Sequence, residues 1–267
     1  MEKYLENVYD IYDRLSREEK ERFYPGPRLT RIDNETPKYL ILGINPSNSY
    51  KPHAEFSKKI CDDLSDIYHL RLNGYKKESQ ERFNDFLSFK NVKQNRGHIC
   101  KLQTLAHRYH GHFKIYRGFA KKLGLLEEHY TFFDLFPLWE IKQKILLRKF
   151  EKHPKLKEKL LDEFLELIDR NQSIEELLFF NRQAYEEFSN FNSSFEMNYQ
   201  LEQKYRVQKK FQKDNSYPWA ILEGSLLLGG GRKIKVWCFG LVASYRYMEE
   251  AEKEKTNVAD EFKHKLK

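Results

Sequence analysis

One short stretch near the N-terminus constrains the fold of this chain more than any other. Residues 39–42 (Tyr-Leu-Ile-Leu) are continuously apolar, and Gly43, Asn45 and Pro46 end the run. A strand that is covered on both faces shows such continuous hydrophobicity, so the run predicts a buried strand ending in a tight turn. In an open α/β sheet, ligands bind beyond the carboxyl ends of strands, which makes this turn a candidate site. Alternatively, Gly43 and Pro46 only shape a connection, and Asn45 tolerates a left-handed backbone.

Strand and helix patterns alternate along the rest of the chain. Three further apolar runs predict strands at 130–137, 175–181 and 233–240. Helical periodicity and a Ser16–Glu19 capping box predict helices within 1–25, 98–124 and 140–172, from 182 onward, and at 244–263. Strands separated by helices are typical of an α/β fold with a mostly parallel sheet, which here is expected to have four strands.

Two polar stretches interrupt this pattern. We expect a single domain over 1–267, with an N-terminal helical extension at 1–30 and insertions at about 48–97 and 190–230. The first insertion interleaves Lys and Arg with Tyr and Phe, which suits a nucleic-acid groove where cations meet phosphates and rings stack on bases. An amphipathic helical insertion with its rings in the core gives the same pattern. The second insertion lacks a clear period through 216, and its polar part is expected to be exposed.

The composition indicates a folded chain that does not enter a membrane. The 267 residues include 20 Phe and 17 Tyr, too many large rings for a disordered chain, so we expect a packed core. No apolar run approaches the roughly 18 residues of a membrane span. The N-terminus is polar and carries no signal-peptide core. We therefore expect a cytoplasmic protein without a membrane partner.

The cysteine content and the net charge limit which classes of protein the chain can belong to. Cys61, Cys100 and Cys238 are the only cysteines, an odd and sparse set that predicts reduced thiols and cannot supply four thiolates to an iron–sulfur cluster. The net charge of +8 and the pI near 9.1 fit a polyanion partner. A modest basic excess also occurs in proteins that bind no nucleic acid, so charge alone leaves both alternatives open.

Histidines gather in one segment. His98, Cys100, His107, His110 and His112 lie close together in the sequence and raise the question of a zinc site. Their spacing matches no standard zinc-ligand pattern. We therefore expect no metal.

Four short segments carry a family resemblance. They are 43–47 (Gly-Ile-Asn-Pro-Ser), His112-Phe113 at a helix start, 133–135 (Phe-Asp-Leu), and 179–188 (FFNRQAYEEF). In this order they resemble motifs of the uracil-DNA glycosylase superfamily, most closely its mismatch-specific uracil/thymine branch. The last segment is the most specific, because it matches several positions with little slack, and the likeness spans about 38–250. It implies a three-layer sandwich and a monomeric enzyme that acts on DNA without a cofactor.

The resemblance also implies roles for particular residues. Asn45 would orient the attacking water, and Phe113 would stack under the flipped base. The remaining substrate-binding positions implied by the matched motifs are Gly43, Ile44, Pro46, Ser47 and Asn181, of which Asn181 also stands where a helix N-cap is expected. No lysine stands in the matched motifs as a Schiff-base nucleophile, so a monofunctional hydrolase is expected.

The final family motif is altered. The family carries an H-P-S or N-P-S loop that ends in a small residue and Arg and wedges into the DNA minor groove. The corresponding stretch here, 238–246, lacks the His and Pro but keeps apolar wedge candidates and an arginine. A flipped base leaves a vacancy that such side chains fill. The expected DNA-binding residues are Leu241, Val242, Ser244 and Arg246. The alternative is a catalytically silent relative that binds nucleic acid through the same groove.

Asp134 departs from the family's Asn and points to a different substrate. An ionised Asp can only accept hydrogen bonds, whereas Asn also donates to a base carbonyl. Asp134 would suit a base that keeps an exocyclic amine, such as a modified cytosine or an adenine-like base, rather than uracil. Repair, or defence against modified foreign DNA, would be the setting. Alternatively, Asp134 caps or salt-bridges structurally. A nucleotide-processing α/β enzyme is a third possibility, but Gly229–Gly231 precedes a strand, which is the wrong context for a phosphate loop.

Overall fold

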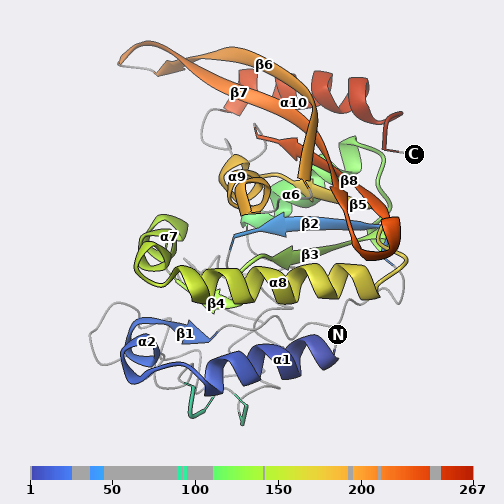
Figure 1. Cartoon of the computed structure of the whole chain (residues 1–267). Helices are drawn as coiled ribbons and strands as arrows, with labels where there is room; N and C mark the ends of the chain where they lie inside the picture. The colour runs from blue at the N-terminus through green and yellow to red at the C-terminus, as the bar shows by residue number, and fades with distance from the viewer. Residues whose placement is uncertain are drawn as a thin grey trace, which may run out of the picture. The chain divides into compact units, whose positions relative to one another are not determined.

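The computed structural model describes residues 2–25, 37–44, 89–91, 93–94, 111–140, 142–191, 195–209, 212–240 and 248–266. Figure 1 shows the helices and strands in these ranges. The chain divides into two compact units. Unit 1 comprises 1–33, 44–114 and 134–167, and unit 2 comprises 34–43, 115–133 and 168–267.

Within the described residues the protein is an α/β protein with a six-stranded, mixed, mostly parallel sheet and seven α-helices. The helices are α1 (Glu2–Asp13), α2 (Arg17–Arg22), α6 (Gly111–Lys122), α7 (Gln143–Lys152), α8 (Pro154–Arg170), α9 (Arg182–Phe191) and α10 (Met248–Phe262). The strands are β1 (Tyr24–Pro25), β2 (Tyr39–Gly43), β3 (Tyr130–Asp134), β4 (Leu138–Trp139), β5 (Glu176–Phe179), β6 (Phe195–Lys209), β7 (Gln212–Leu227) and β8 (Lys233–Phe239). None of these helices combines the length and apolar character needed to cross a membrane.

The large sheet has the strand order β3-β2-β5-β8-β7-β6. Strand β5 runs parallel to both β2 and β8, with Phe179 opposite Leu42 on one side and Cys238 on the other. Lys38 N donates to His129 O before the two strands β2 and β3 begin, and Phe136 N donates to Ile44 O after they end. The start of β2 therefore lies beside the start of β3 and the end beside the end, so this pair is also parallel. Strands β3, β2, β5 and β8 therefore end at the same edge of the sheet.

The prediction of a four-stranded sheet is wrong in the number of strands, because the sheet has six. Residues expected to form an exposed insertion instead build the antiparallel hairpin β6–β7, and β7 pairs with β8 to extend the sheet to six strands. The sequence of β6 does carry a strand pattern, because apolar residues recur at every second position over much of its length. Those residues are Phe195, Met197, Tyr199, Leu201, Tyr205 and Val207. The many polar residues between these positions hid the alternation. The β6–β7 pairing also contains two register irregularities, between Met197 and Tyr199 and between Val207 and Lys209.

Helices cover both faces of the sheet in unit 2. Successive residues at the end of β5 point to opposite faces. The ring of Phe179 lies 5.3 Å from that of Phe188 in α9, whereas the ring of Phe180 lies 5.2 Å from that of Phe119 in α6. On β8, Phe239 contacts both α6 and α10, so these two helices share the face opposite α9. This two-sided cover explains why β2, β5 and β8 read as continuous apolar runs.

The helices of unit 1 begin where the sequence indicates. The predicted capping box is confirmed: Glu19 N donates to Ser16 Oγ at 3.2 Å, and Ser16 N donates to a Glu19 carboxylate oxygen at 2.8 Å. The predicted helical stretch 140–172 is split in two, with His153 between α7 and α8 in a non-helical conformation. Pro154 causes this break, because a proline disfavours helical geometry in the residue before it.

Candidate functional site

The turn after β2 is the predicted centre of the site. Gly43 ends β2, and Ile44 is buried with its carbonyl accepting a hydrogen bond from Phe136 N at 2.9 Å. This bond ties the turn after β2 to the turn after β3. Asn45 follows directly, but it lies outside the described residues together with Pro46 and Ser47. The structure therefore fixes where the Asn45 motif leaves the sheet and leaves its side-chain role as a prediction.

Asp134 is the last residue of β3 and is half-buried. The apolar residues on either side of it, Phe133 and Leu135, are almost fully buried. Since β3 is the neighbour of β2 in the sheet, Asp134 and the start of the Asn45 turn stand at the ends of adjacent strands. Asp134 therefore lies at the edge where open α/β sheets bind their ligands and is not a member of the apolar core.

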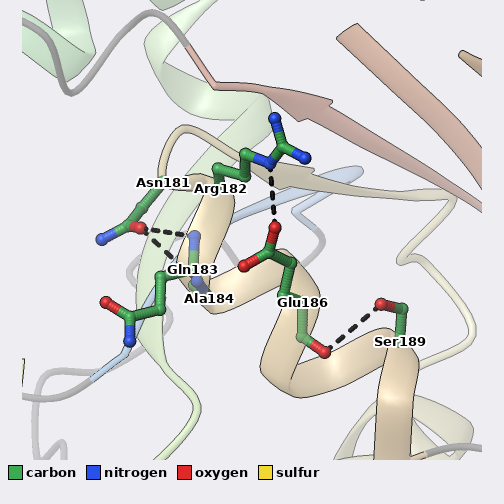
Figure 2. A network of polar contacts seen from close by, with 6 residues as sticks. All are labelled: Asn181, Arg182, Gln183, Ala184, Glu186 and Ser189. Carbon is green, nitrogen blue, oxygen red and sulfur yellow. Dashed lines mark hydrogen bonds and ion pairs between the residues drawn. The ribbon is translucent and has the colours of Figure 1, made fainter. Parts of the chain in front are cut away.

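Asn181 caps helix α9, as its sequence position predicts (Figure 2). Its side-chain oxygen accepts hydrogen bonds from Gln183 N at 2.9 Å and from Ala184 N at 3.4 Å, which satisfies donors that a helix start leaves unpaired. The cap fixes the amide directly beyond the end of β5. Any contact of Asn181 with a ligand would therefore use its nitrogen, Nδ2, because the oxygen is committed to the backbone.

The first turns of α9 carry a solvent-facing ion pair next to this cap. Arg182 Nε lies 2.8 Å from Glu186 Oε1, one helical turn apart, and Ser189 donates to the Glu186 carbonyl (Figure 2). Both charged side chains are about half exposed. An exposed pair of this kind adds little stability to the fold.

Cys238 is a core residue of β8. Its thiol is fully buried, and burial raises the pKa of the thiol well above its usual range. A thiol that stays protonated is neither a nucleophile nor a metal ligand. Cys61 and Cys100 lie outside the described residues, as do nearly all residues of the histidine-rich segment. Among the side chains that the structure describes, no three His, Cys, Asp or Glu gather in a way that could hold a metal ion.

The opposite edge of the sheet holds a buried acid that the sequence did not lead us to expect. Glu176 begins β5, is buried, and accepts a hydrogen bond from Trp237 Nε1 at 2.9 Å. The pKa of the Glu176 carboxyl is raised to about 7, chiefly because burial disfavours its charged form. The nearby Lys235 and the Trp237 hydrogen bond oppose this rise, and the charges of Glu175 and Glu223 add to it. The sequence did contain one indication of this buried acid, which is that Glu176 begins an otherwise apolar run. A charged residue in a strand that is covered on both faces is usually paired with another polar group.

Of the remaining predicted site residues, some lie in the described part of the chain and others lie outside it. Phe113 lies half-buried in the first turn of α6, so the expected helix start is confirmed. Strand β8 ends at Phe239, and Gly240 follows it. The expected DNA wedge beyond it, with Leu241, Val242, Ser244 and Arg246, lies outside the described residues, as does the helix expected at 99–109. The wedge therefore stays a prediction.

Comparison of the chain with protein-family models, with curated proteins and with solved structures finds no match. The case for a function rests on this chain's own residues and on the order of its strands.

Proposed function

We propose that the protein is a monofunctional DNA glycosylase that extrudes a modified base and hydrolyses its N-glycosidic bond, on a three-layer fold of the uracil-DNA glycosylase type. One observation carries the proposal. The segments that resemble family motifs leave the ends of three neighbouring strands: the Gly43 turn after β2, Asp134 at the end of β3, and Asn181 after β5. The ends of adjacent parallel strands are where open α/β sheets bind their ligands.

The proposed chemistry needs few protein groups. The oxygen of a water molecule bonds to the sugar carbon while the N-glycosidic bond breaks, and the bonding electrons leave with the base. The base takes up a proton, and the water gives up one. Asn45 would hold the water, and donors around the base would stabilise its developing negative charge. An amide cannot act as a strong base, so the reaction depends on a good leaving group and is expected to be slow.

Asp134 sets the proposed substrate class. A carboxylate accepts a hydrogen bond from an exocyclic amine, as Asp and Glu do when they read cytosine. The same carboxylate would face the carbonyl of uracil without a donor between them, which disfavours that base. The proposed substrate is therefore a modified cytosine in DNA, and the proposed setting is repair or defence against modified foreign DNA.

The test is base release from DNA. Duplex and single-stranded oligonucleotides with different modified bases are incubated with the full chain and then treated with alkali, which cuts at any abasic site. Release from at least one substrate is expected, with a loss of about 100-fold or more in Asn45→Ala because the water loses its positioning group. The control is Asn190→Ala, which removes an exposed amide from α9. No release from any substrate, or equal rates in Asn45→Ala and wild type, would contradict the proposal.

A second function is favoured by one specific observation. The oxygen of Asn181 caps α9, so part of the most specific motif has a purely structural use. A catalytically silent protein that binds nucleic acid would keep this cap for stability alone. Tight DNA binding without base release in the same substrate panel would favour this alternative.

A further inference from the structure

Helix α7 carries an exposed row of cations. Lys144, Arg148 and Lys152 follow one another at intervals of four residues, and all three are exposed. Residues four apart lie on the same side of a helix, about 6 Å apart along its axis, so the row is about 12 Å long. We call these three residues the basic row. None of them forms an ion pair with another residue in the described part of the chain.

The positive charge at the start of α7 is not explained by helix stability. The N-terminal end of a helix carries a partial positive charge and favours acids, yet the first turn of α7 has no acid and includes Lys144. Lys142 occupies the N-cap position and forms no side-chain capping bond. Lys152 lies in the last turn, where a cation favours the helix, but Lys142 and Lys144 lie at the start, where it does not. A bound anion would be stabilised there by both these cations and the helix end.

Lys149, on the same helix, is a cation whose partners all lie within the fold. Lys149, on the inner side of α7, lies 2.6 Å from Glu140 Oε2 and donates to the Arg22 carbonyl at 2.6 Å. Its ammonium also lies 5.8 Å from the centre of the Phe23 ring. Lys149 is thus fully engaged within unit 1, and the basic row is not. The difference within one helix indicates that the row is directed to a partner.

Helix α2 of unit 1 pairs its charges. On α2, Arg17 pairs with Glu21 at 3.1 Å and Arg22 pairs with Glu18 at 2.8 Å. Glu151 is the one acid in α7, and it pairs with none of the three cations. Lys20, the third cation of α2, donates to the Asp13 carbonyl at 3.1 Å. Each cation of α2 therefore has a partner within unit 1, and the three provide a matched control for those of α7.

We propose that the basic row of α7 binds the phosphate backbone of a nucleic acid. Duplex DNA carries one negative charge per about 1.7 Å of axis, so a row of about 12 Å meets several phosphates within reach of long, flexible side chains. Such contacts position a protein on DNA without reading its sequence. Ile145 is the one exposed large apolar residue of α7, whereas a helix that lies on a membrane carries a broad apolar face. A nucleic acid therefore fits the row better than a lipid surface.

This inference goes beyond the proposed base removal and does not depend on it. Binding to the phosphate backbone is measured on unmodified DNA, and base release is measured with the Asn45→Ala variant on modified DNA. Failure of one therefore leaves the other standing.

The experiment compares two triple variants of equal charge, Lys144→Gln/Arg148→Gln/Lys152→Gln and Arg17→Gln/Lys20→Gln/Arg22→Gln. Binding to a fluorescent, unmodified 20-base-pair duplex is followed by anisotropy over a range of salt concentrations. The slope of log K against log salt falls by about 0.9 for each phosphate that the protein no longer neutralises. The α7 variant is therefore expected to show a slope smaller by about 2–3 and to bind up to about tenfold more weakly at low salt. The α2 variant is expected to keep the wild-type slope.

Three results would overturn the proposal. The first is an unchanged slope in the α7 variant. The second is an equal reduction in both variants, which would show an effect of net charge alone. The third is tighter binding of the wild type to phosphatidylserine vesicles than to the duplex, with vesicle binding abolished only in the α7 variant. Thermal unfolding of both variants checks that the substitutions leave the fold intact, as expected for exposed positions changed to a good helix former.

Discussion

The two ends of strand β5 differ in how they use polar residues. At its start, Glu176 is buried and bonded to Trp237 of the neighbouring strand, so the acid is satisfied inside the fold. Beyond its end, Asn181 is half-buried and uses its oxygen on a helix cap, leaving the amide at the sheet edge. One end therefore contributes stability and pH dependence, and the other presents a polar side chain at the edge where open α/β sheets generally bind ligands.

The largest effect is expected for the amino-terminal end of the strands. Trp237→Ala removes a buried ring that contacts Phe239 and Phe262, and it leaves the Glu176 carboxyl without its donor. We expect the free energy of unfolding in urea to fall by about 3–5 kcal/mol. Trp237→Phe keeps most of the ring volume and is expected to lose about 1–2 kcal/mol. A loss below about 1 kcal/mol in Trp237→Ala would show that this end does not support the fold.

Glu176 makes the stability depend on pH. The pKa of its carboxyl is about 7 in the folded chain, above the ordinary value of 4.5, so the folded state binds more protons than the unfolded state between these pH values. The stabilising contribution is complete below about pH 4.5 and is lost as the pH rises through about 7. Glu176→Gln keeps an acceptor for Trp237 and is expected to be more stable than wild type at pH 8, by about 2–3 kcal/mol.

The control for this prediction is Glu175→Gln, which changes the exposed neighbour that pairs with Lys38 at 3.6 Å. Its stability is expected to keep the fall between pH 5 and 8, with a slightly smaller amplitude because Glu175 is a minor contributor to the raised pKa of Glu176. If Glu176→Gln and wild type lose stability in parallel between pH 5 and 8, another group is responsible and the assignment to Glu176 is wrong.

A smaller effect is expected beyond the end of β5. Asn181→Ala removes the cap of α9 and is expected to cost about 1 kcal/mol in unfolding free energy. Asn181→Asp keeps an oxygen that accepts from Gln183 N and Ala184 N but removes the donating nitrogen. It is expected to retain stability and to lose base release. Full activity in Asn181→Asp would reduce Asn181 to a structural cap and remove the contrast between the two ends of β5.

The smallest effect is expected for the exposed pair on α9. Glu186→Gln breaks the ion pair with Arg182, in which both side chains are about half exposed. The expected decrease in unfolding free energy is at most about 0.5 kcal/mol, and it should vanish in high salt. A decrease above about 1 kcal/mol would mean that the surface of α9 contributes more to the fold than its exposure suggests.

The sequence was most informative where local physics decides the structure. Continuous apolar runs predicted β2, β5 and β8, because strands covered on both faces need them. The Ser16 capping box and the Asn181 cap follow from side chains that satisfy nearby backbone donors, so both were predicted and confirmed. Gly124, with a φ of 78°, ends the helical region at the expected position.

The features that depend on distant partners were not predicted. The β6–β7 hairpin pairs with the edge of β8 that β5 leaves unpaired. The sequence of the hairpin alone does not indicate that this edge is available for pairing. Glu176 finds Trp237 and Lys235 only through the register of β5 and β8, which a single sequence does not display. For the candidate site, the proposed site residues follow three predicted strands, and the structure adds that these strands are neighbours.

The most direct test of the central claim is the ratio of bases released by wild type and by Asp134→Asn. Released bases from DNA with an amino-bearing modified cytosine or with uracil are quantified by mass spectrometry. The account predicts that wild type favours the modified cytosine and that Asp134→Asn shifts the ratio at least tenfold toward uracil, because the amide can donate to a carbonyl. An unchanged ratio, or no release of either base, would contradict it.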